Sequence, residues 1–195
     1  FFAHPGQSSI EYISGKRNAY QKPVSYFLIW TGLYILTHNA IIHYHHLELT
    51  TETIAQLNIR EQSNLLFRQH FTLFILPVIL LSAWLLYLIL GRRKYNFIEI
   101  LTLSLYGGGT YFMMSWISDI VLGMIFQINI LSLQVFFWQM IMSSTYNLWF
   151  SFDFFKRSAV RFFWIRLILA SLSIAFGGWV IMFYLPMLWL KLFNG

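Results

Sequence analysis

The residues best suited to chemistry are five histidines near the facing ends of the first two long apolar runs: His38, His43, His45, His46 and His70. Neutral imidazoles bind zinc, copper and haem iron well, and the ends of two neighbouring helices can bring such side chains together. The five histidines are therefore candidate ligands of a metal ion or a haem.

The same histidines also fit a role without metal. Their spacing follows no established ligand motif, since His38 and His45 lie seven residues apart and share a helix face. Together with Tyr44 they suit a belt of amphipathic rings at a membrane–water interface. We favour the belt and expect no bound cofactor, and a metal- or haem-binding membrane protein stays as an alternative.

Three acidic residues are the next candidates. Glu99 and Asp119 stand at opposite ends of the third apolar run, where an acid inside a membrane often marks an ion or proton path. The pattern Asn96-x-x-Glu99 also predicts a capping box at a helix start, and Asp119 falls at the outer boundary. Asp153 precedes Lys156 by three residues, and we interpret it as an interfacial ion-pair partner.

No catalytic motif accompanies these residues. The sequence lacks Gly-x-Ser-x-Gly, a phosphate-binding loop, His-Glu-x-x-His and a dinucleotide fingerprint. It also contains no cysteine, which excludes disulfides, thiolate nucleophiles and cysteine-based zinc or iron–sulfur sites among these residues. We expect no catalytic residue here and favour a protein that is not an enzyme.

The composition predicts an all-α, polytopic helical membrane protein. Hydrophobic residues make up 58% of the 195 residues and charged residues 10%, against roughly 25% charged residues in a soluble domain. Several apolar runs approach or exceed the roughly 18 residues that mark a membrane-spanning helix. The net charge of +6 is then a record of topology, and we expect no nucleic-acid partner.

We expect about five transmembrane helices, and residues 24–195 form the membrane domain. The polar stretch 43–70 forms a loop on the outer side, and the spans lie at about 24–42, 71–90, 97–117, 131–150 and 165–185. Pro77 should kink the second span. Small residues let helix backbones approach closely, so we expect helix packing, or docking of another subunit, at Gly107, Gly108, Gly109, Ser173 and Gly177.

Basic residues predict the orientation, because lysine and arginine accumulate on the cytoplasmic side of membrane proteins. With the N-terminus in and the C-terminus out, three basic residues fall outside: Arg60, Arg68 and Lys191. The other ten fall inside: Lys16, Arg17, Lys22, Arg92, Arg93, Lys94, Lys156, Arg157, Arg161 and Arg166. All of these except Arg166, which lies within the fifth span, are expected to anchor the protein at the membrane surface.

Residues 1–23 should form a cytoplasmic interfacial helix with a basic anchor. Ser8-x-x-Glu11 predicts a capping box, followed by a short helix that ends before Gly15. Pro23 suits the first turn of the next helix. We expect this element to join a soluble region upstream to the membrane domain.

The opening stretch also resembles a known family. Pro5-Gly6, Glu11-Tyr12, Gly15-Lys16-Arg17, Tyr20 and Pro23 are similar to the signature, here at residues 5–23, of an uncharacterised membrane-protein family common in Bacteroidota. Members often carry a zinc ribbon upstream and commonly have Arg where this chain has His4. The resemblance implies a bacterial inner membrane and supplies no activity.

These observations favour an accessory or scaffold subunit of a larger membrane assembly, without catalysis of its own. Its partners would be the lipid bilayer and other membrane protein subunits. A small transporter or channel-like protein is the second alternative, beside the metal- or haem-binding protein.

Overall fold

The computed structural model describes residues 5–44, 71–91, 94–128, 133–156 and 162–193, and within these ranges the chain is all-α. Six α-helices are described, with a short 3₁₀ helix η1 (Arg17–Ala19) and two π-helical segments, η2 (Tyr87–Gly91) and η3 (Ile120–Ile125). The α-helices are α1 (Pro5–Ile13), α2 (Pro23–Tyr44), α5 (Phe71–Leu86), α6 (Phe97–Asp119), α7 (Leu133–Phe155) and α8 (Phe163–Phe193). The predicted all-α class is confirmed.

Each predicted apolar span overlaps one long helix, and the second span continues from α5 into the π-helical segment η2. A helix pairs the backbone groups of such a run within the run itself. The Asn96 capping box is confirmed at the start of α6, where the Asn96 backbone amide donates to Glu99 Oε2 at 2.9 Å. Helix α7 extends past the expected end at residue 150, and α8 extends past residue 185. Local apolar content marks the middle of a helix better than its ends.

Membrane spanning itself is a separate question from helix content. Within the described ranges, no helix combines the length and apolar character that a membrane crossing requires. The five-span topology, with the N-terminus in and the C-terminus out, therefore stays a prediction.

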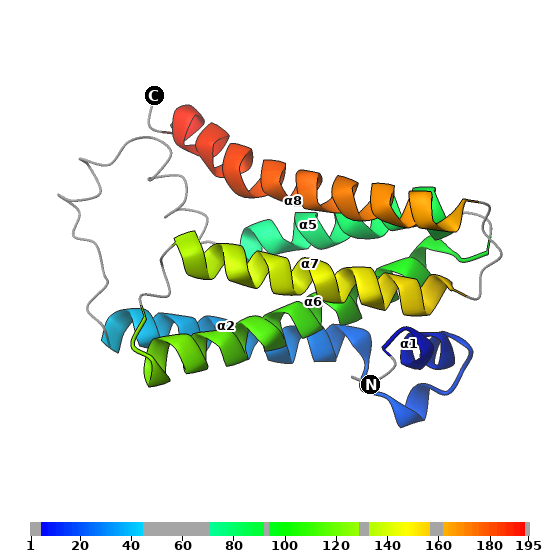
Figure 1. Cartoon of the computed structure of the whole chain (residues 1–195), viewed down its shortest axis with the longest axis horizontal. Coiled ribbons are helices and arrows are strands. Elements are labelled where there is room, and N and C mark those ends of the chain that lie inside the picture. The colour runs from blue at the N-terminus through cyan, green and yellow to red at the C-terminus, as the bar shows by residue number, and fades with distance from the viewer. Residues whose placement is uncertain (1–4, 45–70, 92–93, 129–132, 157–161, 194–195) are drawn as a thin grey trace.

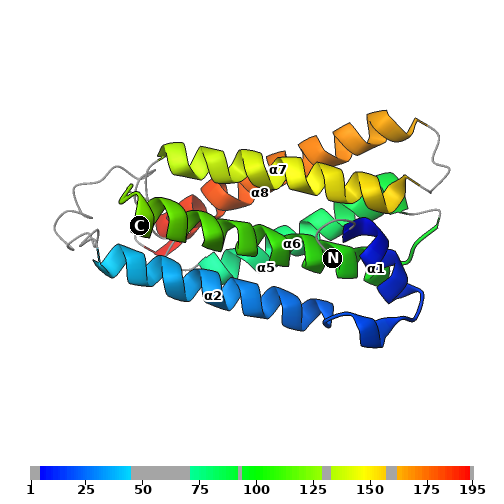
Figure 2. The same ribbon diagram turned by 60° about the horizontal axis from the view of Figure 1, so that its bottom comes forward.

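The five long helices run side by side along one axis, and α1 lies across one end of this bundle (Figures 1 and 2). Helix α6 contacts α2, α5 and α7, while α8 packs against α5 and α7. The core lies around α6, where Leu103, Tyr106 and Phe112 are at most 1% exposed. Helix α6 is thus the central element that positions both ends of the bundle.

Three consecutive glycines allow α6 to be central. Gly107 faces α7, and Gly108 faces side chains of α5 and α2. A Cβ added at Gly109 would lie 2.6 Å from the ring of Tyr26 on α2, closer than real Cβ atoms come. On α8, a Cβ added at Gly177 would lie 2.7 Å from Leu81 of α5, and Ser173 lies one turn earlier and is partly buried.

Candidate functional site

Helix α1 is held against α7 by direct contact between two backbones. A Cβ added at Gly6 would lie 2.2 Å from the backbone nitrogen of Phe154 and 2.5 Å from the carbonyl carbon of Asp153. Neither backbone atom can move aside as a flexible side chain would. Only glycine permits this approach, so Gly6 fixes where α1 meets the bundle.

The N-terminus of α1 is capped by a residue of α7. Asp153, 3% exposed, accepts a hydrogen bond at Oδ2 from the backbone amide of Gln7 at 3.1 Å, and the Lys156 ammonium donates to Oδ1. Burial alone would raise the pKa of Asp153, but Lys156 and the amides of Gln7 and Gly6 outweigh it, so the pKa lies below its usual range. The ionised carboxylate is placed where a helix N-terminus attracts negative charge.

The predicted capping box at Ser8 and Glu11 is therefore wrong. Helix α1 begins at Pro5, so Ser8 lies inside it and is buried. The group that satisfies the first amides is Asp153, which is distant in sequence, and a local pattern carries no information about such a partner.

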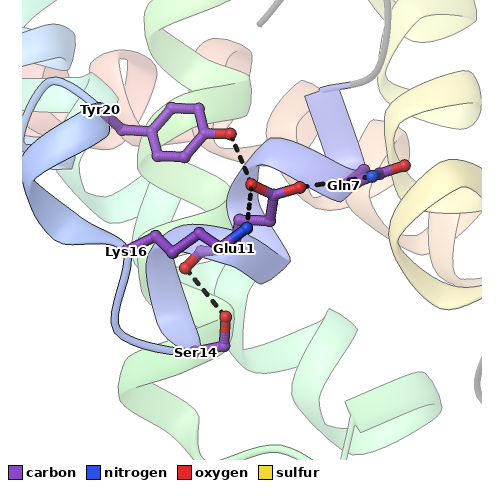
Figure 3. A network of polar contacts seen from close by, with 5 residues as sticks. All are labelled: Gln7, Glu11, Ser14, Lys16 and Tyr20. Carbon is purple, nitrogen blue, oxygen red and sulfur yellow. Dashed lines mark hydrogen bonds and ion pairs between the residues drawn. The ribbon is translucent and has the colours of Figure 1, made fainter.

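Glu11 instead organises the connection that follows α1 (Figure 3). Its carboxylate accepts hydrogen bonds from Gln7 Nε2 at 3.3 Å, Lys16 Nζ at 3.3 Å and the Tyr20 hydroxyl at 3.1 Å. These bonds hold the pKa of Glu11 below its usual range, and the bond from Gln7 has the largest effect. The positive charge of Lys16 lowers the pKa further. One side chain thereby joins α1, the turn after it and the segment leading to α2.

The turn after α1 is a Schellman motif, the ending that the Gly15 position predicts. Gly15 has a φ of 112°, a conformation that glycine adopts without strain. The backbone amide of Lys16 donates to the carbonyl of Glu11 at 3.0 Å, and that of Gly15 donates to the carbonyl of Tyr12 at 3.2 Å. The chain thus reverses here into η1.

Aromatic rings join α1 and the start of α2 to α6. Tyr12 meets Tyr106 edge to face, with 5.8 Å between ring centroids, and Tyr106 also packs against Tyr26 of α2. The Tyr106 hydroxyl donates to the backbone carbonyl of Gln21, just before α2. Helix α1 and the start of α2 are therefore both tied to the middle of α6.

The described members of the predicted basic anchor all lie at the α1 end. Arg17 lies in η1, Lys22 directly precedes α2, and Lys94 lies over the ring of Tyr95 at 5.6 Å. Arg166, near the start of α8, donates to the Ile89 carbonyl at 3.4 Å. Four other members of the basic set fall outside the described residues: Arg92, Arg93, Arg157 and Arg161.

At the opposite end, the structure joins two residues that the sequence singled out separately. His38 Nδ1 of α2 lies 2.6 Å from Asp119 Oδ2 at the end of α6, and Gln139 Nε2 of α7 donates to Asp119 Oδ1 at 2.8 Å. The Asp119 side chain is 1% exposed and that of His38 is 15% exposed. Gln139 gave no sequence signal, since an isolated glutamine in an apolar run has many possible partners.

The predicted histidine site is not assembled within the described residues. His43 lies in the last turn of α2, while His45, His46 and His70 fall outside the described ranges. In the part of the chain that the structure describes, no three His, Cys, Asp or Glu side chains are placed to hold a metal ion. The arrangement of His38 with a carboxylate and an amide offers proton chemistry in place of metal coordination.

Comparison with known proteins identifies a family only for the opening stretch. Residues 1–35 match the model of a family described as Protein of unknown function (DUF3667). No curated protein and no solved structure matches the chain. The matched residues include α1, η1 and the first part of α2, so the docked N-terminal element is the part of this chain that is similar to an uncharacterised family.

Proposed function

We propose that this protein is an accessory or scaffold subunit of a larger membrane assembly in the bacterial inner membrane. In this proposal the α1 element is the platform that a partner subunit contacts, and the chain performs no catalysis. The observation that carries the proposal is the docking of α1: Gly6, Asp153 and Glu11 hold it in one fixed geometry. A flexible tether would need none of these contacts.

Exposed apolar side chains support the membrane part of the proposal. Large hydrophobic residues are exposed on several helices, among them Leu36 at 70%, Trp138 at 64% and Leu172 at 62%. A lipid bilayer can cover exposed apolar side chains of this kind, because its hydrocarbon core is as apolar as they are. Helices α2, α6 and α7 contain 22, 23 and 23 residues, a length of about 33 Å at 1.5 Å per residue.

Charge supports the orientation. Six of the seven lysines and arginines in the described ranges lie at the α1 end, and Lys191 in α8 is the seventh. Basic residues near anionic headgroups contribute about 1 kcal/mol each. The α1 end would therefore face the cytoplasm.

The topology can be tested with single cysteines, because the chain has none of its own. Ser14→Cys marks the α1 end, and Ile128→Cys marks the connection at the other end of the bundle. In intact cells, a membrane-impermeant maleimide should label Ile128→Cys and spare Ser14→Cys. Labelling of both positions from the same side would eliminate the spanning topology.

The scaffold role can be tested by purification in mild detergent followed by mass spectrometry. The full chain should bring down stoichiometric membrane partners. The double change Lys16→Gln with Arg17→Gln should release them while insertion stays normal, and Lys94→Gln, a basic residue at the same end outside the α1 element, should retain them. Altered insertion with partners retained would restrict Lys16 and Arg17 to orienting the first span.

A small transporter is the second candidate function, and the buried pair of His38 and Asp119 favours it. Ionisable side chains within membrane helices often lie on ion or proton paths. A monodisperse protein without partners that supports substrate-dependent flux in liposomes would favour this candidate over the scaffold.

A further inference from the structure

A buried group of polar side chains surrounds Asp119. Three helices contribute one side chain each: His38 from α2, Asp119 from α6 and Gln139 from α7. Helix α6 ends at Asp119 and continues as the π-helical segment η3, a distortion that is frequent at functional sites. Each carboxylate oxygen of Asp119 lies within hydrogen-bond distance of one of the other two side chains, so the group is built around Asp119.

The charge of this group depends on one proton. Gln139 is neutral, and a neutral imidazole donating from Nδ1 leaves the buried carboxylate with a net charge of −1. A second proton on the imidazole makes the pair neutral overall. Because a buried charge without a counter-charge is costly, taking up that proton removes an unfavourable state.

His38 is the side chain through which the proton can arrive. Its exposed fraction of 15% exceeds the 1% of Asp119, and its ring has a second nitrogen besides the one facing the carboxylate. Imidazole is also the side chain that changes charge between about pH 5 and pH 8.

Within the described ranges, the groups that contact His38 and Asp119 carry no permanent positive charge. Two titratable neighbours among the described residues are Tyr34 of α2, whose ring centroid lies 5.2 Å from that of His38, and Tyr111 of α6, which interacts with the Asp119 charge. Trp116 of α6 and Thr37 of α2 bond to each other at 2.8 Å and are neutral. Among these described neighbours, His38 is the side chain that can carry a positive charge beside Asp119.

We infer that His38 and Asp119 form a proton-binding site, in which His38 takes a proton from the medium while Asp119 remains an ionised counter-charge and Gln139 positions it. The proton comes from water and adds to a ring nitrogen, and no bond between heavy atoms changes. This site is independent of the scaffold role proposed for the α1 end.

The chain offers a selective spectroscopic test, because Asp119 and Asp153 are its only aspartates. Labelling this 195-residue chain with ¹³C-carboxyl aspartate in lipid marks these two side chains alone. Infrared difference spectra are then recorded between about pH 8 and pH 5, the range over which histidine changes charge. Asp153 is the internal control, since Lys156 and backbone amides already compensate it.

The expected result is a shift of one labelled carboxylate band, without the appearance of a labelled carboxylic acid. Asp119→Asn should abolish this shift, whereas Asp153→Asn, at the opposite end of the bundle, should retain it. In His38→Phe the buried carboxylate loses its counter-charge, so a labelled carboxylic acid band should appear in place of the shift.

Two results would overturn the inference. One is a wild-type protein whose labelled bands do not change over this pH range, a measurement that needs no variant. The other is a change that persists in Asp119→Asn or disappears in Asp153→Asn, because it would then arise from Asp153.

Discussion

Two buried aspartates lie at opposite ends of the bundle, and their charges are compensated in different ways. Asp153, 3% exposed, meets the Lys156 ammonium and the first amides of α1. Asp119, 1% exposed, meets an imidazole and a neutral amide. Among the described residues, the Asp153 carboxylate thus meets a lysine ammonium, while the Asp119 carboxylate meets an imidazole and a neutral amide.

This difference separates the tasks for which each end is suited. A carboxylate that is always compensated gives α1 an attachment that does not respond to mild changes of pH. A carboxylate whose counter-charge depends on the protonation of an imidazole can respond to the pH of the medium. The fixed pair, Asp153 with Lys156, lies beside α1, which is within the stretch similar to a known family. The responsive pair, Asp119 with His38, lies about one helix length away.

The largest effect is expected from Gly6→Ala, which separates Asp153 from the amides that it caps. The new Cβ would meet the α7 backbone at 2.2 Å, so α1 must leave its position. We expect a loss of about 3 kcal/mol in the free energy of unfolding, because backbone atoms cannot repack around an added methyl group. Limited proteolysis of α1 and thermal unfolding in detergent would measure it.

Gly32→Ala is the matched control, because it is the same change within a helix where nothing lies within 4 Å of the added Cβ. Alanine favours a helix over glycine by about 1 kcal/mol, so this variant should be neutral or slightly more stable. Equal destabilisation by both changes would contradict the docking of α1 through Gly6.

Asp153→Ala should cost about 2 kcal/mol, because the cap is lost and buried amides of α1 are left without an acceptor. The pKa of Asp153 is lower in the folded protein than its ordinary value of 3.8. Its contribution is therefore fully present at neutral pH and is lost as the pH falls through the lowered folded value. Hydrogen exchange at the backbone amide of Gln7 would measure both the loss of the cap and its pH dependence. The exchange rates of the wild type and the variant should become equal only in strong acid.

The helices could be predicted from the sequence, because each apolar run contains enough information to define its own helix. The start of α6 could be predicted for the same reason, since Asn96 and Glu99 satisfy each other within one turn. The start of α1 could not, because its cap comes from Asp153, 146 residues after Gln7. Local patterns predict local partners only.

The same limit applies to the site at Asp119 and His38, because its contacts join residues that are distant in sequence. Asp119 and His38 are ionisable groups at the ends of apolar runs, but their contact spans 81 residues, which no local pattern predicts. The sequence suggested a histidine cluster because those residues are close along the chain. Pairing across helices depends on how α2, α6 and α7 pack, which hydropathy does not specify.

A smaller effect is expected next to the responsive pair, where Thr37→Val tests packing without changing charge. The indole Nε1–H of Trp116 donates to Thr37 Oγ1 at 2.8 Å, and valine leaves this partly buried donor without its partner. We expect a loss of about 1 kcal/mol in thermal or denaturant unfolding. Thr37→Ser retains the hydroxyl and should lie close to wild type, and the carboxylate band shift expected for Asp119 should survive in both variants.

The smallest effect is expected from Glu11→Gln at the α1 end, because its partner Lys16 is 67% exposed and water competes for both groups. Because the pKa of Glu11 is lowered, the carboxylate is ionised at neutral pH. Its ion pair with Lys16 is lost only when the pH falls below the usual pKa of a glutamate. The variant should speed hydrogen exchange at the backbone amides of residues 16–20 at low salt. At about 1 M salt the increase should be smaller, because the screening length falls to about 3 Å and the ion pair is already weakened in the wild type. Tyr20→Phe removes a neutral donor from the same carboxylate and should give a change that salt does not alter. If salt has no influence on the Glu11→Gln effect, the network acts through hydrogen bonds alone, and the ion pair with Lys16 contributes nothing to fixing the turn after α1.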